Sequence, residues 1–268
     1  MELKGKLTRD DRRIYEEGLV PICQAVTKKF DDLRLSKPTT DALIEIHQGL
    51  VAITSSIMTL CEQERTSSQA TASLMRTLID CCLSAFALCK NPEEEAELYN
   101  NFRAVQDFRF ACCQEKHLGC PLSDTPEDHH KIAENIDKAR KILETVGLDF
   151  LPKKKRNQAN LRKALSNDSH NAFRDKWYLE ERRELLKEEG MEWVYDYLHL
   201  RLCSAVHSDS AASMVFNFDR HIVFTWSWQF YSAAVCRLVE AFPIGLPNDQ
   251  MQFLQNTYTG LQYKESVT

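Results

Sequence analysis

Glycine and proline are scarce in this chain, with 8 of each among 268 residues. β-Sandwiches and doubly wound α/β folds need many turns, and these two residues are the ones that make turns. Their scarcity therefore favours long helices joined by few loops. Because 43% of the residues are hydrophobic and 27% are charged, the chain can both bury a core and keep a solvated surface. We expect one all-α domain over residues 1–268, built as a multi-helix bundle.

A large excess of charge of one sign is also absent, since the net charge is −5. This balance argues against a protein that coats a polyanion with its whole surface. Long uncharged runs are missing too: the longest candidate, residues 222–236, is shorter than the ~20 residues that cross a bilayer. The chain begins with charged residues and lacks the apolar stretch of a secretory leader. We therefore expect a cytoplasmic protein without a membrane segment.

The 10 cysteines do not predict a disulfide framework. Most of them, including Cys61, Cys82 and Cys236, fall within apolar helical stretches, where a thiol behaves as a small hydrophobic group. Without a secretory leader, these thiols are expected to be reduced.

Apolar residues recur with a period of about 3.6 residues along most of the chain, which is the pattern of amphipathic helices. Three weakly charged helices, at about 41–61, 69–89 and 222–236, are expected to form the core. A charged helix at 125–147 has a narrow apolar stripe and is expected at the periphery. Residues 149–170 are expected to form a mobile basic connecting loop. The other expected helices span about 8–30, 91–114, 177–189, 191–207 and 248–261.

Several catalytic signatures are missing: the chain has no glycine-rich phosphate loop, no HExxH motif and no nucleophile elbow. These absences argue against an ATPase, a zincin or a classical hydrolase. What remains is Arg201-x5-His207, because an arginine can hold a phosphate and a histidine can move a proton near neutral pH. Six helical steps place the two side chains roughly 120° apart, with Ser204 between them. They converge only if the helix ends or bends near His207, or if a second copy supplies one of them. The alternative is an arginine in a salt bridge and a histidine that caps the helix.

Arg76 and Asp80 are the only charged residues within the helix expected at 69–89. Because they are four residues apart, they lie on the same face. One interpretation is an internal ion pair that fixes the position of this helix. The other is a polar cluster facing the helix that carries Arg201 and His207. In that case Arg76 helps to hold a phosphate and Asp80 orients His207.

A basic run, Lys153, Lys154, Lys155 and Arg156, lies in the segment expected to be mobile. Clustered basic residues without interleaved aromatics fit attraction to a phosphate backbone rather than recognition of bases. The run is thus a candidate nucleic-acid contact, and the alternative is a solvated loop.

Cys113, His117 and Cys120, with His129 and His130 further along, are residue types that bind zinc. Their spacing matches no standard zinc knuckle, so we expect neither a metal nor another cofactor.

The stretch from Trp177 through Gly190 and Tyr197 to Ser204-Ala205-Val206-His207-Ser208 resembles part of an uncharacterised bacterial all-helical family, a numbered domain of unknown function. The likeness covers about residues 40–240. Arg76-x3-Asp80 matches an Arg-x3-acid element of that family, with aspartate where glutamate is usual.

The Arg201-x5-His207 spacing is similar to the Arg-x4–6-His signature of the HEPN superfamily, although Leu202 stands where Asn, Asp or His is common. This resemblance implies a metal-independent endoribonuclease of a bacterial defence or toxin system, acting on RNA and forming a homodimer or binding a partner protein. It implies that Arg201 binds the scissile phosphate and that His207 acts as the general acid or base. Arg76, Asp80 and Ser204 would support them. The alternative function is a non-catalytic helical module that binds a protein or nucleic acid.

Overall fold

A computed structural model describes residues 3–30, 32–63, 66–116, 126–166, 172–178, 180–199, 202–203 and 219–262, without the side chains of 126–129. The described residues form helices and connecting segments, and no β-strand is found among them. The all-α, multi-helix prediction is therefore confirmed. The chain divides into two compact units, residues 1–93 with 180–268 and residues 94–179. Each unit is described by itself, and the expectation of a single domain stays a prediction.

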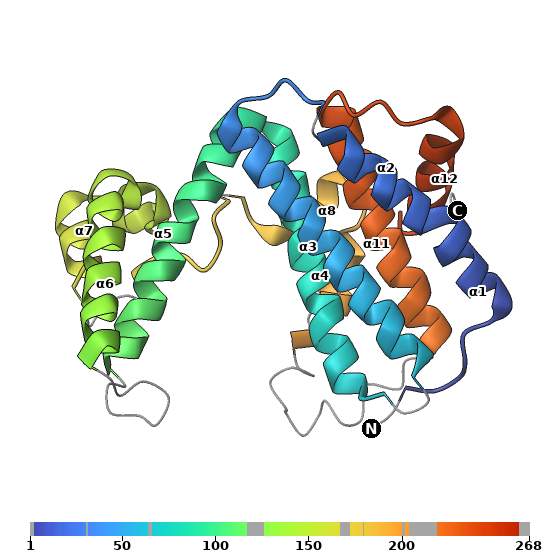
Figure 1. Cartoon of the computed structure of the whole chain (residues 1–268), viewed down its shortest axis with the longest axis horizontal. Coiled ribbons are helices and arrows are strands. Elements are labelled where there is room, and N and C mark those ends of the chain that lie inside the picture. The colour runs from blue at the N-terminus through green and yellow to red at the C-terminus, as the bar shows by residue number, and fades with distance from the viewer. Residues whose placement is uncertain are drawn as a thin grey trace. The chain divides into compact units, whose positions relative to one another are not determined.

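The first unit is built around three helices that pack against one another: α3 (Lys37–Glu62), α4 (Ser68–Lys90) and α11 (Arg220–Ala241). They lie side by side in the ribbon (Figure 1). Leu43, Leu83 and Val235, one from each helix, are completely buried. The predicted core of three weakly charged helices is thus confirmed.

The first core helix starts earlier than the sequence suggested. The sequence predicts this helix from about residue 41, after Lys37 and Pro38, whereas α3 begins at Lys37. A proline in the first turn of a helix is tolerated because its missing N–H would have no partner there. The Ser36 side chain caps this turn by accepting a hydrogen bond from the backbone N–H of Thr39.

The helix expected at 8–30 is present in three pieces: α1 (Arg9–Arg13), the π-helical turn η1 (Ile14–Leu19) and α2 (Val20–Phe30). Gly18 lies in the π-helical turn, and a Cβ atom there would come within 2.6 Å of the Phe253 ring. The glycine thereby lets α12 (Asn248–Tyr258) approach closely.

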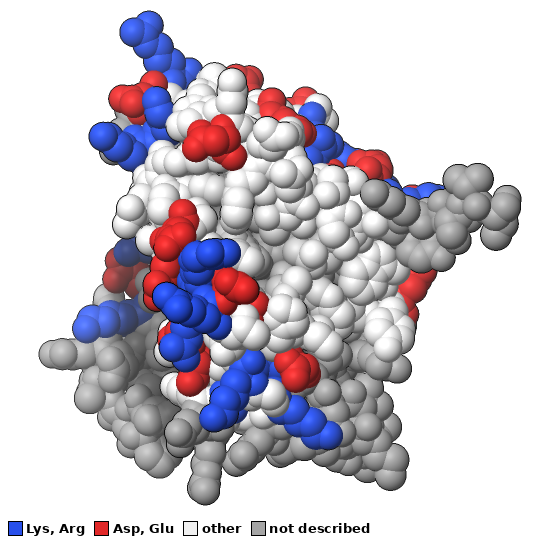
Figure 2. All heavy atoms as spheres, turned by 90° about the vertical axis from the view of Figure 1, so that its right-hand side faces the viewer, with Lys and Arg blue, Asp and Glu red and all other residues white. Residues whose placement is uncertain are grey.

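The surface that carries α1 and α12 combines a broad uncharged area with mixed charges. Figure 2 shows Lys and Arg side chains interspersed with Asp and Glu on this face. The uncharged character follows from the composition of α12, in which Asp249 is the only charged residue. This face therefore lacks the one-sided positive field that attracts a phosphate backbone.

The remaining helices of the first unit are α8 (Arg182–Glu188) and the π-helical η5 (Val194–His199), which contact each other, with α8 also packed on α4. The helix expected at 177–189 begins only at Arg182. Its first part is not helical because the backbone carbonyls of Trp177 and Tyr178 accept hydrogen bonds from the Arg174 guanidinium instead.

The second unit contains most of α5 (Pro92–Lys116), followed by α6 (Pro126–Val146), η2 (Gly147–Phe150), η3 (Lys153–Lys155) and α7 (Gln158–Ala164). The apolar stripe of α6 is buried, as predicted, at Ile132, Ile136, Ala139 and Leu143. The segment expected to be a basic loop instead contains two short helices up to residue 166. It is anchored because Leu161 and Ala164 are buried.

Two helices, α3 and α4, are long and apolar enough to span a membrane by length and composition. The buried share of their most apolar windows is 39% and 56%. Core helices of a bundle pass the same test, and both helices here pack against α11.

His47 is completely buried in this core, with its Nε2 3.1 Å from the hydroxyl oxygen of Tyr231. Burial lowers the pKa of His47 to about 4. In the unfolded chain the pKa returns to about 6.5, so below that pH the unfolded state binds a proton that the folded state excludes. The folded protein therefore loses stability as the pH falls from 6.5 towards 4.

We predict that His47 alone contributes a loss of about 2–3 kcal/mol in the free energy of unfolding between pH 7 and pH 4.5. The variant His47→Gln keeps a polar group near Tyr231 but does not titrate, so it should lose less stability over this range than the wild type. Urea unfolding at the two pH values measures both losses. Equal losses in the two proteins would show that His47 is not the group responsible.

Candidate functional site

A cluster of polar residues lies on one side of α4, where Arg76 and Asp80 are both partly buried. An Oδ1 atom of Asp80 lies 3.5 Å from the Nε of Arg182 on α8. Within the described part of the chain, no ion pair joins Arg76 to Asp80. Asp80 is therefore paired with Arg182 and not with Arg76, and this ion pair connects α4 to α8.

His199, the last residue of η5, completes this cluster. Only 5% of the residue is exposed, and its ring stacks on that of Tyr195 with an angle of 14° and a centroid distance of 5.3 Å. Burial lowers the pKa of His199, Asp80 opposes this effect, and the positive charges of Arg182 and Arg76 add to it. The imidazole is therefore neutral near pH 7, the form that can accept a proton.

A thiol lies next to this imidazole. The Sγ of Cys203 is 3.6 Å from the Nδ1 of His199 and 4.0 Å from its Nε2. The two residues are four apart in the sequence, the spacing of neighbours on one face of a helix. Cys203 is partly buried and forms no disulfide.

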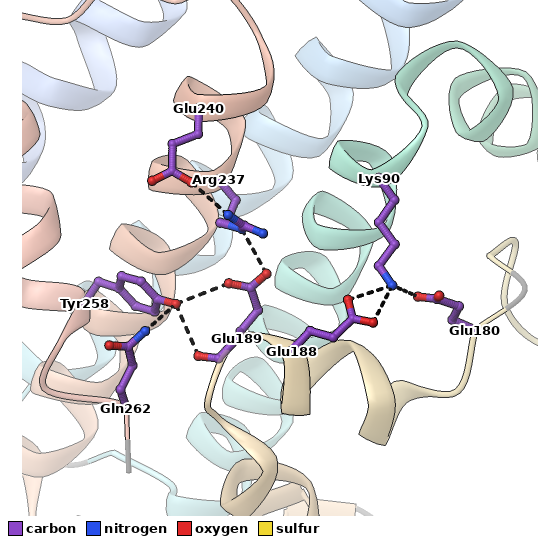
Figure 3. Close-up of polar contacts among 8 residues, drawn as sticks. All are labelled: Lys90, Glu180, Glu188, Glu189, Arg237, Glu240, Tyr258 and Gln262. Atoms are coloured by element: carbon purple, nitrogen blue, oxygen red, sulfur yellow. Dashed lines mark hydrogen bonds and ion pairs between the residues drawn. The ribbon is translucent and has the colours of Figure 1, made fainter. Parts of the chain in front are cut away.

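The position of Arg182 depends on how α8 is held. Lys90 connects the two ends of α8: its ammonium group lies 2.7 Å from a carboxylate oxygen of Glu188, the last residue of α8, and 2.5 Å from one of Glu180, which precedes the helix (Figure 3). The guanidinium of Arg183 forms a two-pronged ion pair with Asp196, at 3.0 Å for both contacts, and so connects α8 to η5. These contacts fix the two elements that supply Arg182 and His199.

The C-terminal end of α8 is also anchored by Glu189, the residue that follows Glu188, of which only 6% is exposed. Its carboxylate accepts a hydrogen bond from Arg237 at 2.9 Å and one from the Tyr258 hydroxyl at 3.2 Å (Figure 3). Burial raises the pKa of Glu189, against the opposing effects of Arg237 and Tyr258.

Gly190 then ends α8, as the sequence suggested. Its φ is +70°, in the left-handed region that favours glycine. The N–H of Gly190 bonds to the carbonyl of Lys187, and that of Met191 bonds to the carbonyl of Leu186. These two bonds form a Schellman motif, which directs the chain away from α8 and into the segment that carries η5.

The structure describes only some of the residues predicted for the site. Arg76 and Asp80 are described, and they belong to a polar cluster with His199. His199 comes from the helix predicted at 191–207. Arg201, Ser204 and His207 lie outside the described residues, so their predicted roles stay predictions.

Sequence reasoning did not single out Arg182 and His199. Arg182 is one of two adjacent arginines on a short helix, a pattern that does not say which of them points inward. His199 precedes Cys203 by four residues, a spacing that places two side chains close together on a helix. The Arg201-x5-His207 spacing nearby drew attention away from this pair.

The four residues of the basic run, Lys153, Lys154, Lys155 and Arg156, differ in their exposure. The three lysines form η3 and are exposed. Arg156 is partly buried, and its guanidinium donates to the backbone carbonyls of Leu151 and Asp149. The lysines are thus available to a ligand, whereas Arg156 also stabilises the local fold.

Only two of the five candidate zinc ligands have side chains that the structure describes. Cys113 is exposed on α5 and His130 is exposed on α6. His117 and Cys120 lie outside the described residues, and so does the side chain of His129. Among the described residues, no three His, Cys, Asp or Glu side chains are grouped to hold a metal ion.

The fold and the polar cluster define an all-helical protein with a charged site on its core bundle. A sequence model of DUF5677, a family of unknown function, matches residues 40–221. Because this match covers more than half of the chain, the protein belongs to that family. No curated protein and no solved structure matches the chain.

The neighbouring residues Glu188 and Glu189 offer a matched test of what holds α8. Replacing Glu189 with alanine leaves Arg237 and Tyr258 without their buried acceptor, and we predict a loss of about 2 kcal/mol in the free energy of unfolding. Glu188 has a 53% exposed side chain, so Glu188→Ala should cost within about 0.5 kcal/mol. Urea unfolding of the two variants measures both changes. Equal losses would contradict an anchoring role for Glu189.

Proposed function

We propose that this protein is a HEPN-like, metal-independent endoribonuclease of a bacterial defence or toxin system, acting in the cytoplasm. The observation that carries the proposal is a neutral imidazole, His199, that is close enough to Arg76, Arg182 and Asp80 for their charges to act on it. His199 lies in the same part of the sequence as Arg201 and His207. Phosphodiester cleavage without a metal can use a neutral histidine as the proton acceptor and arginines as the groups that stabilise the phosphate charge.

The reaction would begin when the 2′-hydroxyl oxygen of the RNA attacks the adjacent phosphorus atom. A base accepts the hydroxyl proton, the bond from phosphorus to the 5′ oxygen breaks, and an acid donates a proton to that oxygen. His199 suits the base because the lowered pKa keeps its imidazole unprotonated. His207 would then be the acid, which needs a proton at the start of the cycle.

Negative charge builds up on the phosphate oxygens during this step, and fixed positive charges stabilise it. Arg76 fits this role because, within the described residues, no carboxylate forms an ion pair with it. Arg201 would be a second phosphate ligand. Arg182 is held by Asp80 at 3.5 Å, so it would contribute its charge from a fixed position.

The exposed lysines of η3 would add an attraction to RNA that does not depend on its sequence. Lys153, Lys154 and Lys155 are consecutive and exposed, and each can neutralise one phosphate. As the HEPN-like resemblance implies, the active form would be a homodimer or a complex with a partner protein.

The test is cleavage of a mixed-sequence single-stranded RNA by the purified protein in the presence of EDTA. We predict cleavage by the wild type and a loss of at least about 100-fold in His199→Gln and His207→Ala. Arg76→Gln should lose about 10- to 100-fold through weaker phosphate stabilisation. His130→Ala, which changes an exposed histidine on α6, is the matched control and should keep full activity.

Cleavage that persists at the wild-type rate in both His199→Gln and His207→Ala would contradict the proposal. So would a wild type that leaves the RNA intact at every concentration tested.

A second function, a non-catalytic binding module, is favoured by one observation: His199 is 5% exposed and stacked on Tyr195, as a structural residue would be. In this case His199→Gln lowers the melting temperature, and no variant changes RNA cleavage because there is none. Melting curves of the same variants separate the two functions. An enzyme would retain its melting temperature in His207→Ala while losing activity.

A further inference from the structure

Cys203 differs from most described cysteines in what surrounds its thiol. Its Sγ lies 3.6 Å from an imidazole nitrogen of His199, within the distance of a hydrogen bond to sulfur. Cys82, by contrast, is buried and donates to a backbone carbonyl, that of Phe230. Burial raises the pKa values of seven other thiols: Cys23, Cys61, Cys81, Cys82, Cys89, Cys112 and Cys236.

The imidazole beside Cys203 is held in a defined position. The ring is stacked on Tyr195, and only 5% of the residue is exposed. In the tautomer whose Nδ1 carries no proton, this nitrogen can accept the thiol proton at the 3.6 Å contact.

Charged groups around the pair come from two further elements. Arg76 and Asp80 lie on α4, Arg182 lies on α8, and all three act electrostatically on His199. Of these groups, Asp80 stabilises an imidazolium once His199 has taken the proton. Partly exposed cysteines in surroundings of this kind are the ones that react.

We propose that Cys203 is a reactive thiol that hydroperoxides oxidise to a sulfenic acid, with His199 as the group that moves the proton. Nothing in this inference depends on RNA cleavage. It assigns to this face of the protein a site of reversible covalent modification.

The Sγ of Cys203 attacks one oxygen of hydrogen peroxide while its proton passes to His199. The S–O bond forms and the O–O bond breaks. The leaving hydroxide takes the proton from His199 and departs as water. Sulfur is oxidised and the peroxide is reduced, with no other reactant needed.

The experiment treats the whole protein with hydrogen peroxide at pH 7, traps sulfenic acids with dimedone and quantifies each cysteine peptide by mass spectrometry. Cys113 is the internal control because it is exposed on α5, far more open to reagent than Cys203. We expect Cys203 to be labelled at least about ten-fold faster than Cys113 despite its lower exposure. In His199→Gln the rate at Cys203 should fall by about ten-fold or more, while Cys113 is unchanged. Labelling of Cys113 as fast as Cys203 would overturn the proposal, and so would an unchanged rate at Cys203 in His199→Gln.

If His199→Gln does not fold, the pH dependence in the wild type decides. Because His199 is neutral across this range, the rate at Cys203 should change by less than about three-fold between pH 8 and pH 6.5. An exposed thiol without an adjacent base has no such proton acceptor, so its rate should fall more steeply over the same range. Rates that fall in parallel at Cys203 and Cys113 would overturn the proposal.

Discussion

The packing of α3, α4 and α11 against one another is the constraint on which the rest of the first unit depends. The core side of α4 is filled by buried apolar residues such as Leu78 and Leu83. Its two interior charges, Arg76 and Asp80, therefore lie on the opposite side, where partial burial of the Asp80 carboxylate favours a charged partner. Arg182 supplies that partner from α8, and α8 in turn contacts η5, which ends at His199.

The sequence predicts much of the fold because helix periodicity and capping are local properties. The three core helices and the end of α8 at Gly190 follow from such signals. The late start of α8 does not, because the Arg174 guanidinium hydrogen-bonds to the nearby backbone carbonyls of Trp177 and Tyr178, a side-chain contact that apolar periodicity does not reveal. The short helix α7 was not predicted either. Its sequence is mostly polar and basic, and only Leu161 and Ala164 are buried, so the apolar pattern is too short to recognise.

For the site, the sequence identifies the helix face but not its full set of residues. Arg76 and Asp80 stand out as the only charges in an apolar helix, so their spacing is informative. The partner of Asp80 is about a hundred residues away along the chain, and no spacing rule connects them. The value of His199 as a proton acceptor also depends on burial and on three charges from two helices, none of which can be derived from neighbouring residues.

The central claim is that these charges and the burial of His199 keep its imidazole neutral at the site. NMR titration of the His199 ring protons measures its pKa directly. The account predicts a pKa below the ordinary value of about 6.5, lowered further in Asp80→Asn and raised in Arg182→Gln. A pKa at or above the ordinary value that neither substitution changes would contradict it.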